Sequence, residues 1–314
     1  FLDIANNVQE KTQLEIQRII VDAYLGAIAA QANVTVLDEN INTLSKNVEE
    51  VHQLFRSGFG EEESVEQLQL TLTSLNNQLD YAKNMAELSH SVVKLLLGIP
   101  LDNPLELTDQ LEGLVLKSLN MEEEDPGYAN NIDLRIAENQ ITTEEIFYRL
   151  EKAKGLPSLT AFFNGAYMGN NDRFGFTDKD QKWFGSAAFG VRVKIPIFSS
   201  FGRTASAQKA KITLEQAKTA FDEARSKVYY EYEQAKNNYR LAIKKHINTK
   251  DQLNLAERIE KKNKIKFFEG LATSFELRQA QIQLFSIQQS YIQSMQAVVV
   301  QKTALDIIIN NNPQ

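Results

Sequence analysis

The stretch KFFEGLATSFEL, residues 266–277, decides how the rest of the chain is interpreted. Gly270 lies near its middle, and a long run with helical periodicity lies on either side. Glycine adopts the left-handed backbone conformation that ends many helices more readily than other residues do. The stretch therefore predicts the tip of a long antiparallel hairpin, where one helix arrives and another leaves.

An earlier stretch has the same layout. Residues 55–60, FRSGFG, again contain a central glycine. Residues 64–66 match residues 274–276 if the first tip holds a two-residue insertion. A repeat of this size indicates one architecture built twice. Only the second repeat has a strand pair inside the chain, so we expect an equivalent pair, and thus a further segment, before Phe1.

Long helices are predicted outward from both tips. In the first repeat, apolar residues recur at steps of three and four, which is typical of helices packed along one seam. They are Leu37, Ile41, Leu44, Val48, Val51 and Phe55 before the tip, and Leu68, Leu72, Leu75, Leu79, Ala82 and Ala86 after it. The returning helix should end near Gly98 and Pro100. No run of about 18 apolar residues is present, so no membrane-spanning helix is expected.

The apolar period changes from about 3.6 to 2 between the two helical repeats. In the first strand, Leu159, Ala161, Phe163, Gly165 and Tyr167 share one face, and Phe162 is an exception on the other. In the second strand, Ala187, Phe189, Val191, Val193 and Ile195 alternate with Ser186, Ala188, Gly190, Arg192 and Lys194. Strands of about ten residues cross a bilayer when tilted. A soluble hairpin, half-buried on one face, would show the same alternation, so both interpretations stay open.

Composition argues against several classes of protein. The net charge of −7 disfavours a nucleic-acid binder, and the absence of cysteine removes disulfides and thiol chemistry. His52, His90 and His246 are isolated, without the spacing of metal ligands. The acidic run Glu122–Asp125 is interpreted as a solvated loop. No nucleophile or phosphate-binding motif is present, so no catalytic residue, metal or cofactor is predicted.

Three segments together resemble the TolC-type outer-membrane efflux proteins: residues 156–159, residues 193–198 and residues 268–277. Residues 95–98 are similar to the end of the family's first returning helix. The resemblance implies a homotrimer in the outer membrane of a Gram-negative bacterium, with its helical part in the periplasm. Each subunit would give four strands to a shared transmembrane β-barrel, in contact with outer-membrane lipid, and four long helical segments to a trimeric α-barrel. A periplasmic adaptor (membrane fusion) protein would link this exit duct to an inner-membrane transporter of an efflux or type I secretion system.

We therefore predict a mainly α fold with a β-hairpin and two internal repeats. The first helical hairpin would cover residues 1–99, and equatorial helices and loops residues 100–156. The outer-membrane β-hairpin would cover residues 157–200, the second helical hairpin residues 201–309, and a short tail residues 310–314.

The resemblance also implies roles for individual residues. Adaptor docking falls on the tips, at Gly58, Phe59, Gly60, Gly270, Leu271, Ala272, Thr273 and Ser274. A periplasmic aperture of carboxylates falls at Glu66 and Glu276, with Gln279 at a further position that is acidic in the family. In the barrel, Arg192 and Lys194 would face the lumen, whereas Phe189, Val191 and Val193 would face lipid.

Plainer interpretations of these residues stay open. Glu66 and Glu276 are also placed where a helix dipole favours a carboxylate, and Thr273 or Ser274 is a suitable N-cap. The whole chain also fits a soluble coiled-coil scaffold with the strand pair as a cap. Adaptor proteins themselves have helical hairpins, but only one, flanked by lipoyl-like β segments. The orientation of residues 158–198 toward lipid would separate a duct from a scaffold.

Overall fold

The computed structural model describes residues 2–119, 127–170, 172, 175, 177 and 179–309. The acidic run Glu122–Asp125 and the tail 310–314 lie outside the described residues. The chain forms two compact units, which are treated separately below. One unit comprises Phe1–Arg135 with Arg225–Gln314, and the other comprises Ile136–Ala224.

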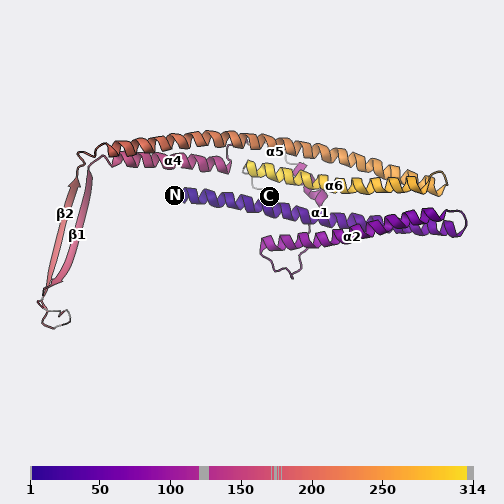
Figure 1. Ribbon diagram of the computed structural model, residues 1–314, viewed down its shortest axis with the longest axis horizontal. Coiled ribbons are helices and arrows are strands. Elements are labelled where there is room, and N and C mark those ends of the chain that lie inside the picture. The colour runs from indigo at the N-terminus through magenta and orange to yellow at the C-terminus, as the bar shows by residue number, and fades with distance from the viewer. Residues whose placement is uncertain are drawn as a thin grey trace. The chain divides into compact units, whose positions relative to one another are not determined.

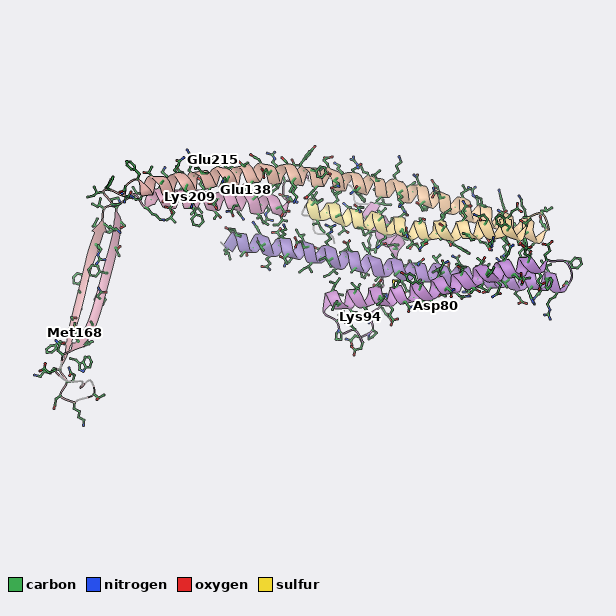
Figure 2. The ribbon with its side chains drawn as sticks, in the orientation of Figure 1. Asp80, Lys94, Glu138, Met168, Lys209 and Glu215 are labelled. Atoms are coloured by element: carbon green, nitrogen blue, oxygen red, sulfur yellow. The ribbon has the colours of Figure 1, made fainter. Side chains whose placement is uncertain are left out.

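The helices follow the predicted pattern (Figure 1). Their bounds, with those of the two strands, are α1 Leu2–Arg56, α2 Glu62–Leu97, α3 Leu111–Leu119, α4 Ile132–Ala153, β1 Ser158–Gly169, β2 Trp183–Lys194, α5 Gly202–Phe268 and α6 Ser274–Ile308. As predicted, α2 ends at Gly98, which is left-handed with φ 67°. Lys94 in the last turn of α2 donates from Nζ to the Leu101 carbonyl at 3.0 Å, and so helps to hold the chain as it leaves the helix (Figure 2).

The seam between α1 and α2 is the apolar stripe expected from the sequence. Its buried side chains are Val34, Leu37, Leu44, Val51, Leu68, Leu75, Leu79, Ala82 and Ala86. Ile41, Val48 and Leu72 pack at its edge and are only partly buried. Residues spaced three and four apart lie on the same face of a helix. Their apolar side chains therefore form a stripe that packs α1 against α2 along most of the first hairpin.

A second apolar cluster joins α1, α3, α5 and α6 in the same unit. It includes Leu25 and Ile28 of α1, Val115 of α3, Tyr239 of α5 and Val298 of α6. The Tyr239 hydroxyl donates to the Ser118 carbonyl at 2.8 Å, so the one polar atom of that buried ring is satisfied.

The apolar stretch of α1 bears on the expectation that no helix spans a membrane. Among the described residues, α1 is long and apolar enough to qualify by composition as a membrane-spanning helix. Its apolar residues are interrupted by Asp22, Gln31, Asn33 and Thr35, so no unbroken apolar run of this length is present. In the structure, Leu25, Ile28 and Ala29 from the middle of α1 are buried in the second cluster. Packing in the core therefore accounts for part of this apolar stretch.

The strand pair belongs to the other unit. β1 and β2 are antiparallel, and their register places Phe163 opposite Phe189 and Thr160 opposite Arg192. Phe162, the exception to the alternation, lies opposite Gly190, where an added Cβ would come within 2.8 Å of its ring. Arg192 lies over the same ring at 5.6 Å. The ring therefore covers a glycine and stacks with a cation on the face that carries Arg192 and Lys194.

Candidate functional site

The second tip is built by a Schellman cap at the end of α5. Gly270 has φ 72°, and its N–H donates to the Phe267 carbonyl at 3.0 Å. The Leu271 N–H donates to the Lys266 carbonyl at 2.7 Å. These two bonds satisfy carbonyls that the helix end would otherwise leave unpaired, and they fix the direction in which the chain turns.

The first tip has the same cap. Gly58 has φ 77°, and its N–H donates to the Phe55 carbonyl at 2.9 Å. The Phe59 N–H donates to the Leu54 carbonyl, also at 2.9 Å. The matching hydrogen bonds at Gly58 and Gly270 support the internal repeat that was predicted from the sequence.

Each cap presents an apolar side chain to solvent. The residue after the capping glycine usually packs back on the last turn of the helix. Here Phe59 is 86% exposed and Leu271 is 72% exposed. Two rigid turns therefore hold an uncovered apolar group at the extreme end of each hairpin.

The capping glycines are expected to be essential for stability. An Ala at position 270 would place a Cβ in a left-handed conformation, which costs about 1–2 kcal/mol. Gly26 offers a matched control, because it lies inside α1 with open space around an added Cβ. Gly26→Ala should stabilise by about 0.5–1 kcal/mol. Thermal unfolding of the two variants should therefore shift in opposite directions, and equal shifts would contradict the role of the cap.

The start of α6 is held by a capping box. Thr273 Oγ1 accepts from the Glu276 N–H at 3.3 Å, and Glu276 Oε2 accepts from the Thr273 N–H at 2.7 Å. Of the two N-cap candidates, Thr273 is thus the cap. Ser274 instead donates to Oε1 of Gln67 in α2 at 3.4 Å. The pattern Thr-x-x-Glu in the sequence was a signal for this box, whereas nothing local signalled the contact with Gln67.

The Glu276 carboxylate is stabilised in its charged form. Hydrogen bonds from the Thr273 backbone N–H and side chain, and then the charge of Lys266, lower the pKa of Glu276 below its ordinary value of 4.5. A lowered pKa contributes stability above the unfolded-state value, and this contribution is lost as the pH falls through the folded-state value.

We therefore expect Glu276→Ala to be less stable than the parent chain at pH 7. The difference should shrink as the pH falls below about 4.5, because the parent carboxylate then becomes protonated. Thermal unfolding across this pH range measures the difference. A difference that does not change with pH would show that the charged capping box contributes nothing.

The other predicted aperture residues lie near the tips on helix surfaces. Glu66 and Gln279 are exposed, like Glu276. The first tip differs in its helix start, since Glu61 is the N-cap of α2 but forms no side-chain capping bond. Glu62 and Glu63 follow in the first turn, where the helix dipole favours negative charge. The first tip is therefore the more acidic of the two.

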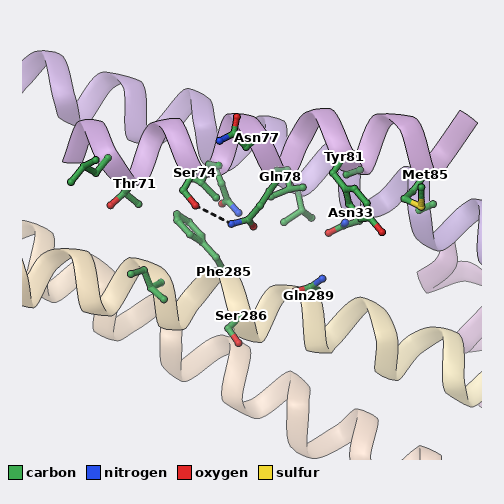
Figure 3. Close-up of a pocket in the computed structure, with 18 of the residues that line it drawn as sticks. Asn33, Thr71, Ser74, Asn77, Gln78, Tyr81, Met85, Phe285, Ser286 and Gln289 are labelled. Atoms are coloured by element: carbon green, nitrogen blue, oxygen red, sulfur yellow. Dashed lines mark hydrogen bonds between the residues drawn. The ribbon is translucent and has the colours of Figure 1, made fainter. Parts of the chain in front are cut away.

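A groove runs beside these tips between α1, α2 and α6. Its volume is about 760 Å³, and amide and hydroxyl side chains alternate with apolar ones along it. Figure 3 shows Phe285 projecting from α6 toward α2, near Ser74 and Gln78. Sequence reasoning missed this groove, because it is formed by residues far apart in the chain.

The strand pair presents two chemically distinct faces. Leu159, Phe163, Phe189, Val191 and Val193 share one face, and they are between 58% and 87% exposed. Arg192 and Lys194 lie on the opposite face, in line with the predicted division between lumen and lipid. Figure 2 shows Met168 near the loop end of the pair. Within the described part of its own unit, no side chain covers the apolar face.

His246 has structural surroundings, whereas Nε2 of His90 is buried without a hydrogen-bond partner among the described residues. His246 is buried between α5 and α6, where its Nδ1 lies 3.2 Å from Ser294 Oγ and its ring stacks on Tyr291. Burial, and then the charge of Lys250, lower the pKa of His246. Across the described ranges, no group of three acidic or histidine side chains could hold a metal ion.

Comparison with known proteins gives a family match. A family model described as outer membrane efflux protein matches residues 128–311. No curated protein sequence matches the chain.

Several solved structures share the fold. The outer membrane protein VceC from Vibrio cholerae is 18% identical with a TM-score of 0.74, and the match covers 98% of this chain and 72% of VceC. The Neisseria gonorrhoeae outer membrane channel MtrE, solved in an open state, is 14% identical with a TM-score of 0.73, over 98% of this chain and 68% of MtrE. The Campylobacter jejuni channel CmeC is 14% identical with a TM-score of 0.70, over 99% and 66%. The predicted fold class, long helical hairpins with a β-hairpin, is confirmed.

Proposed function

The chain belongs to the outer membrane efflux protein family, and we propose that it is the exit duct of a tripartite efflux or type I secretion system. The observation that carries this proposal is the strand pair, whose apolar face is uncovered over a length that spans a bilayer. The duct does no chemistry itself. Its transport is passive and is coupled to an inner-membrane transporter through a periplasmic adaptor.

The proposed assembly is a homotrimer in the outer membrane, with the helical hairpins in the periplasm. Backbone polar groups cannot be left unpaired in lipid, so a two-stranded sheet must join other strands in a closed barrel. The strand pairs of three copies would take part in such a barrel. Phe189, Val191 and Val193 would then face lipid, and Arg192 and Lys194 the lumen.

The two tips are the proposed adaptor-docking sites. Phe59 and Leu271 are uncovered apolar groups on rigidly capped turns, which suits them to bind a partner with little ordering cost. Gly58, Gly60 and Gly270 would maintain the turns, and Ala272, Thr273 and Ser274 would complete the second docking surface.

Glu66 and Glu276 are the proposed aperture carboxylates. Three copies of each near a narrow entrance would attract cations and repel anions. The part that Glu276 plays in the capping box is compatible with this role, because the hydrogen bonds from Thr273 keep the side chain charged.

Two opposite substitutions test the aperture. Glu276→Gln removes the charge but leaves a side chain that can still cap α6. Gln279→Glu adds a carboxylate one turn further along the helix. In planar bilayers at low salt, the cation-to-anion permeability ratio should fall several-fold in the first variant and rise in the second. An unchanged ratio in both would remove these residues from the conducting path.

Electron microscopy of the detergent-extracted full-length protein tests the proposed function. A hollow threefold cylinder with a helical part roughly 100 Å long is expected, since α5 has 67 residues at about 1.5 Å each. Solid rods, or a protein that never enters the membrane fraction, would instead favour a soluble coiled-coil scaffold.

A further inference from the structure

Amide side chains recur at heptad spacing on α1 and α6, one helix from each hairpin. α1 contains Asn40 and Asn47, and α6 contains Gln281 and Gln288. Seven residues are about two turns of a helix, so each pair lies on one face of its own helix. Asn40, Asn47 and Gln281 are all buried, with exposures of 8%, 0% and 2%.

One pair of amides defines how the two helices are aligned. Asn40 Nδ2 donates to Gln288 Oε1 at 2.8 Å. α1 runs toward the tips and α6 runs away from them, so a step of seven residues forward on α1 matches seven residues backward on α6 (Figure 1). From Asn40 and Gln288, that step leads to Asn47 and Gln281. The alignment therefore places these two buried amides at the same level.

This second pair is left unsatisfied. Neither Nδ2 nor Oδ1 of Asn47 has a hydrogen-bond partner among the described residues, and neither has Oε1 of Gln281. Burying an amide without its hydrogen bonds is unfavourable, and an apolar pair of similar shape would be at least as stable. Stability alone therefore does not account for amides at these positions.

Movement of α6 along α1 would bring its glutamines against apolar side chains. If α6 moved by four residues along α1, Gln288 would meet Leu44 and Gln281 would meet Val51, both only 1% exposed. A movement by three residues the other way would set the glutamines against Leu37 and Leu44. A full heptad, about 10 Å, would break the contact of Ser274 with Gln67 at the tip.

We propose that Asn47 and Gln281 are positioning residues, the second rung of an amide ladder that fixes where α6 lies along α1. Displacement would break the Asn40–Gln288 hydrogen bond and would set Gln288 and Gln281 against buried apolar side chains, as buried amides specify alignment in coiled coils. Asn40 of the first rung also lines the groove, together with residues of α6. The proposal concerns packing within the chain and holds whatever the chain transports.

Disulfide trapping tests whether the two amides face each other. The sequence has no cysteine, so introduced thiols are the only ones present. Asn47→Cys with Gln281→Cys should form a disulfide on mild oxidation. Asn47→Cys with Gln288→Cys, one heptad out of line, should not, because a disulfide needs Cα atoms within about 7 Å. Equal trapping of the two pairs, or none in the first, would overturn the rung.

A second pair of cysteines tests whether the rung positions the helix. A disulfide between Leu44→Cys and Gln288→Cys would report that α6 is displaced by four residues along α1. This pair should stay reduced while Asn47 and Gln281 are present, and should become trapped once both are replaced by Leu. No trapping in the Leu background would show that the rung does not set the alignment.

Thermal unfolding distinguishes the second rung, which lacks hydrogen bonds, from the pair Asn40 and Gln288, which has one. Asn47→Leu with Gln281→Leu should unfold at a higher temperature than Asn40→Leu with Gln288→Leu, which loses a formed hydrogen bond. The opposite order would mean that the second rung is satisfied in solution, and would overturn the proposal.

Discussion

Replacing Leu271 by Asp is expected to abolish transport while leaving the folded trimer intact. The side chain of Leu271 is 72% exposed, and its structural bond to the Lys266 carbonyl uses the backbone N–H, which Asp retains. Docking of an adaptor on this tip would bury the leucine, and such burial stabilises by about 1.5–3 kcal/mol. An aspartate would instead carry an unpaired charge into the contact, at each of the three tips of a trimer.

Accumulation of a fluorescent efflux dye measures this effect in cells that contain no other duct. Trimer amount in the outer membrane is measured in parallel on a native gel. Leu271→Met is the matched control, because it keeps an apolar side chain of similar volume and should transport normally. Normal transport by Leu271→Asp would remove the second tip from docking. Phe59→Asp makes the same test of the first tip.

The sequence was most informative where one short pattern decides local structure. Gly58 and Gly270 were placed at the tips because a left-handed turn favours glycine, and both have positive φ. The α1–α2 seam followed from steps of three and four, and most of its expected residues are buried, but Val34 joins it and Phe55 is 37% exposed. The alternation of apolar and polar residues likewise predicted which strand residues share a face.

What the sequence did not predict depends on contacts between distant residues. Phe162 broke the alternation, and its place became clear only when the register set it over Gly190 and under Arg192. Ser274 was a plausible cap, but its actual partner is Gln67, more than two hundred residues away. The buried amides of α1 and α6 have no unusual local pattern either, since a heptad of Asn or Gln is equally consistent with a solvated face.

The proposed docking and aperture residues all lie at or near the two tips. Glu276 illustrates why local geometry does not decide between roles. The same carboxylate caps α6 and is fully exposed, so a structural role and an aperture role do not exclude each other. Permeability measurements on Glu276→Gln and Gln279→Glu are needed because they separate charge from capping.

Phe189→Arg is expected to prevent membrane assembly, whereas Ala188→Arg is expected to permit it. The two positions are neighbours near the middle of β2, and the register places Phe189 beside Phe163 on the apolar face and Ala188 beside Asn164 on the other. An arginine facing lipid at the bilayer midplane costs about 2–4 kcal/mol, and a trimer would meet this cost three times. An arginine facing the lumen stays in water and joins Arg192 and Lys194.

Heat-modifiable migration of the outer-membrane fraction on a gel measures assembly for both variants. If both variants assemble equally well, the apolar face does not contact lipid, and the strand pair is an ordinary soluble hairpin. If only Ala188→Arg fails, the lipid and lumen faces are the reverse of those proposed here.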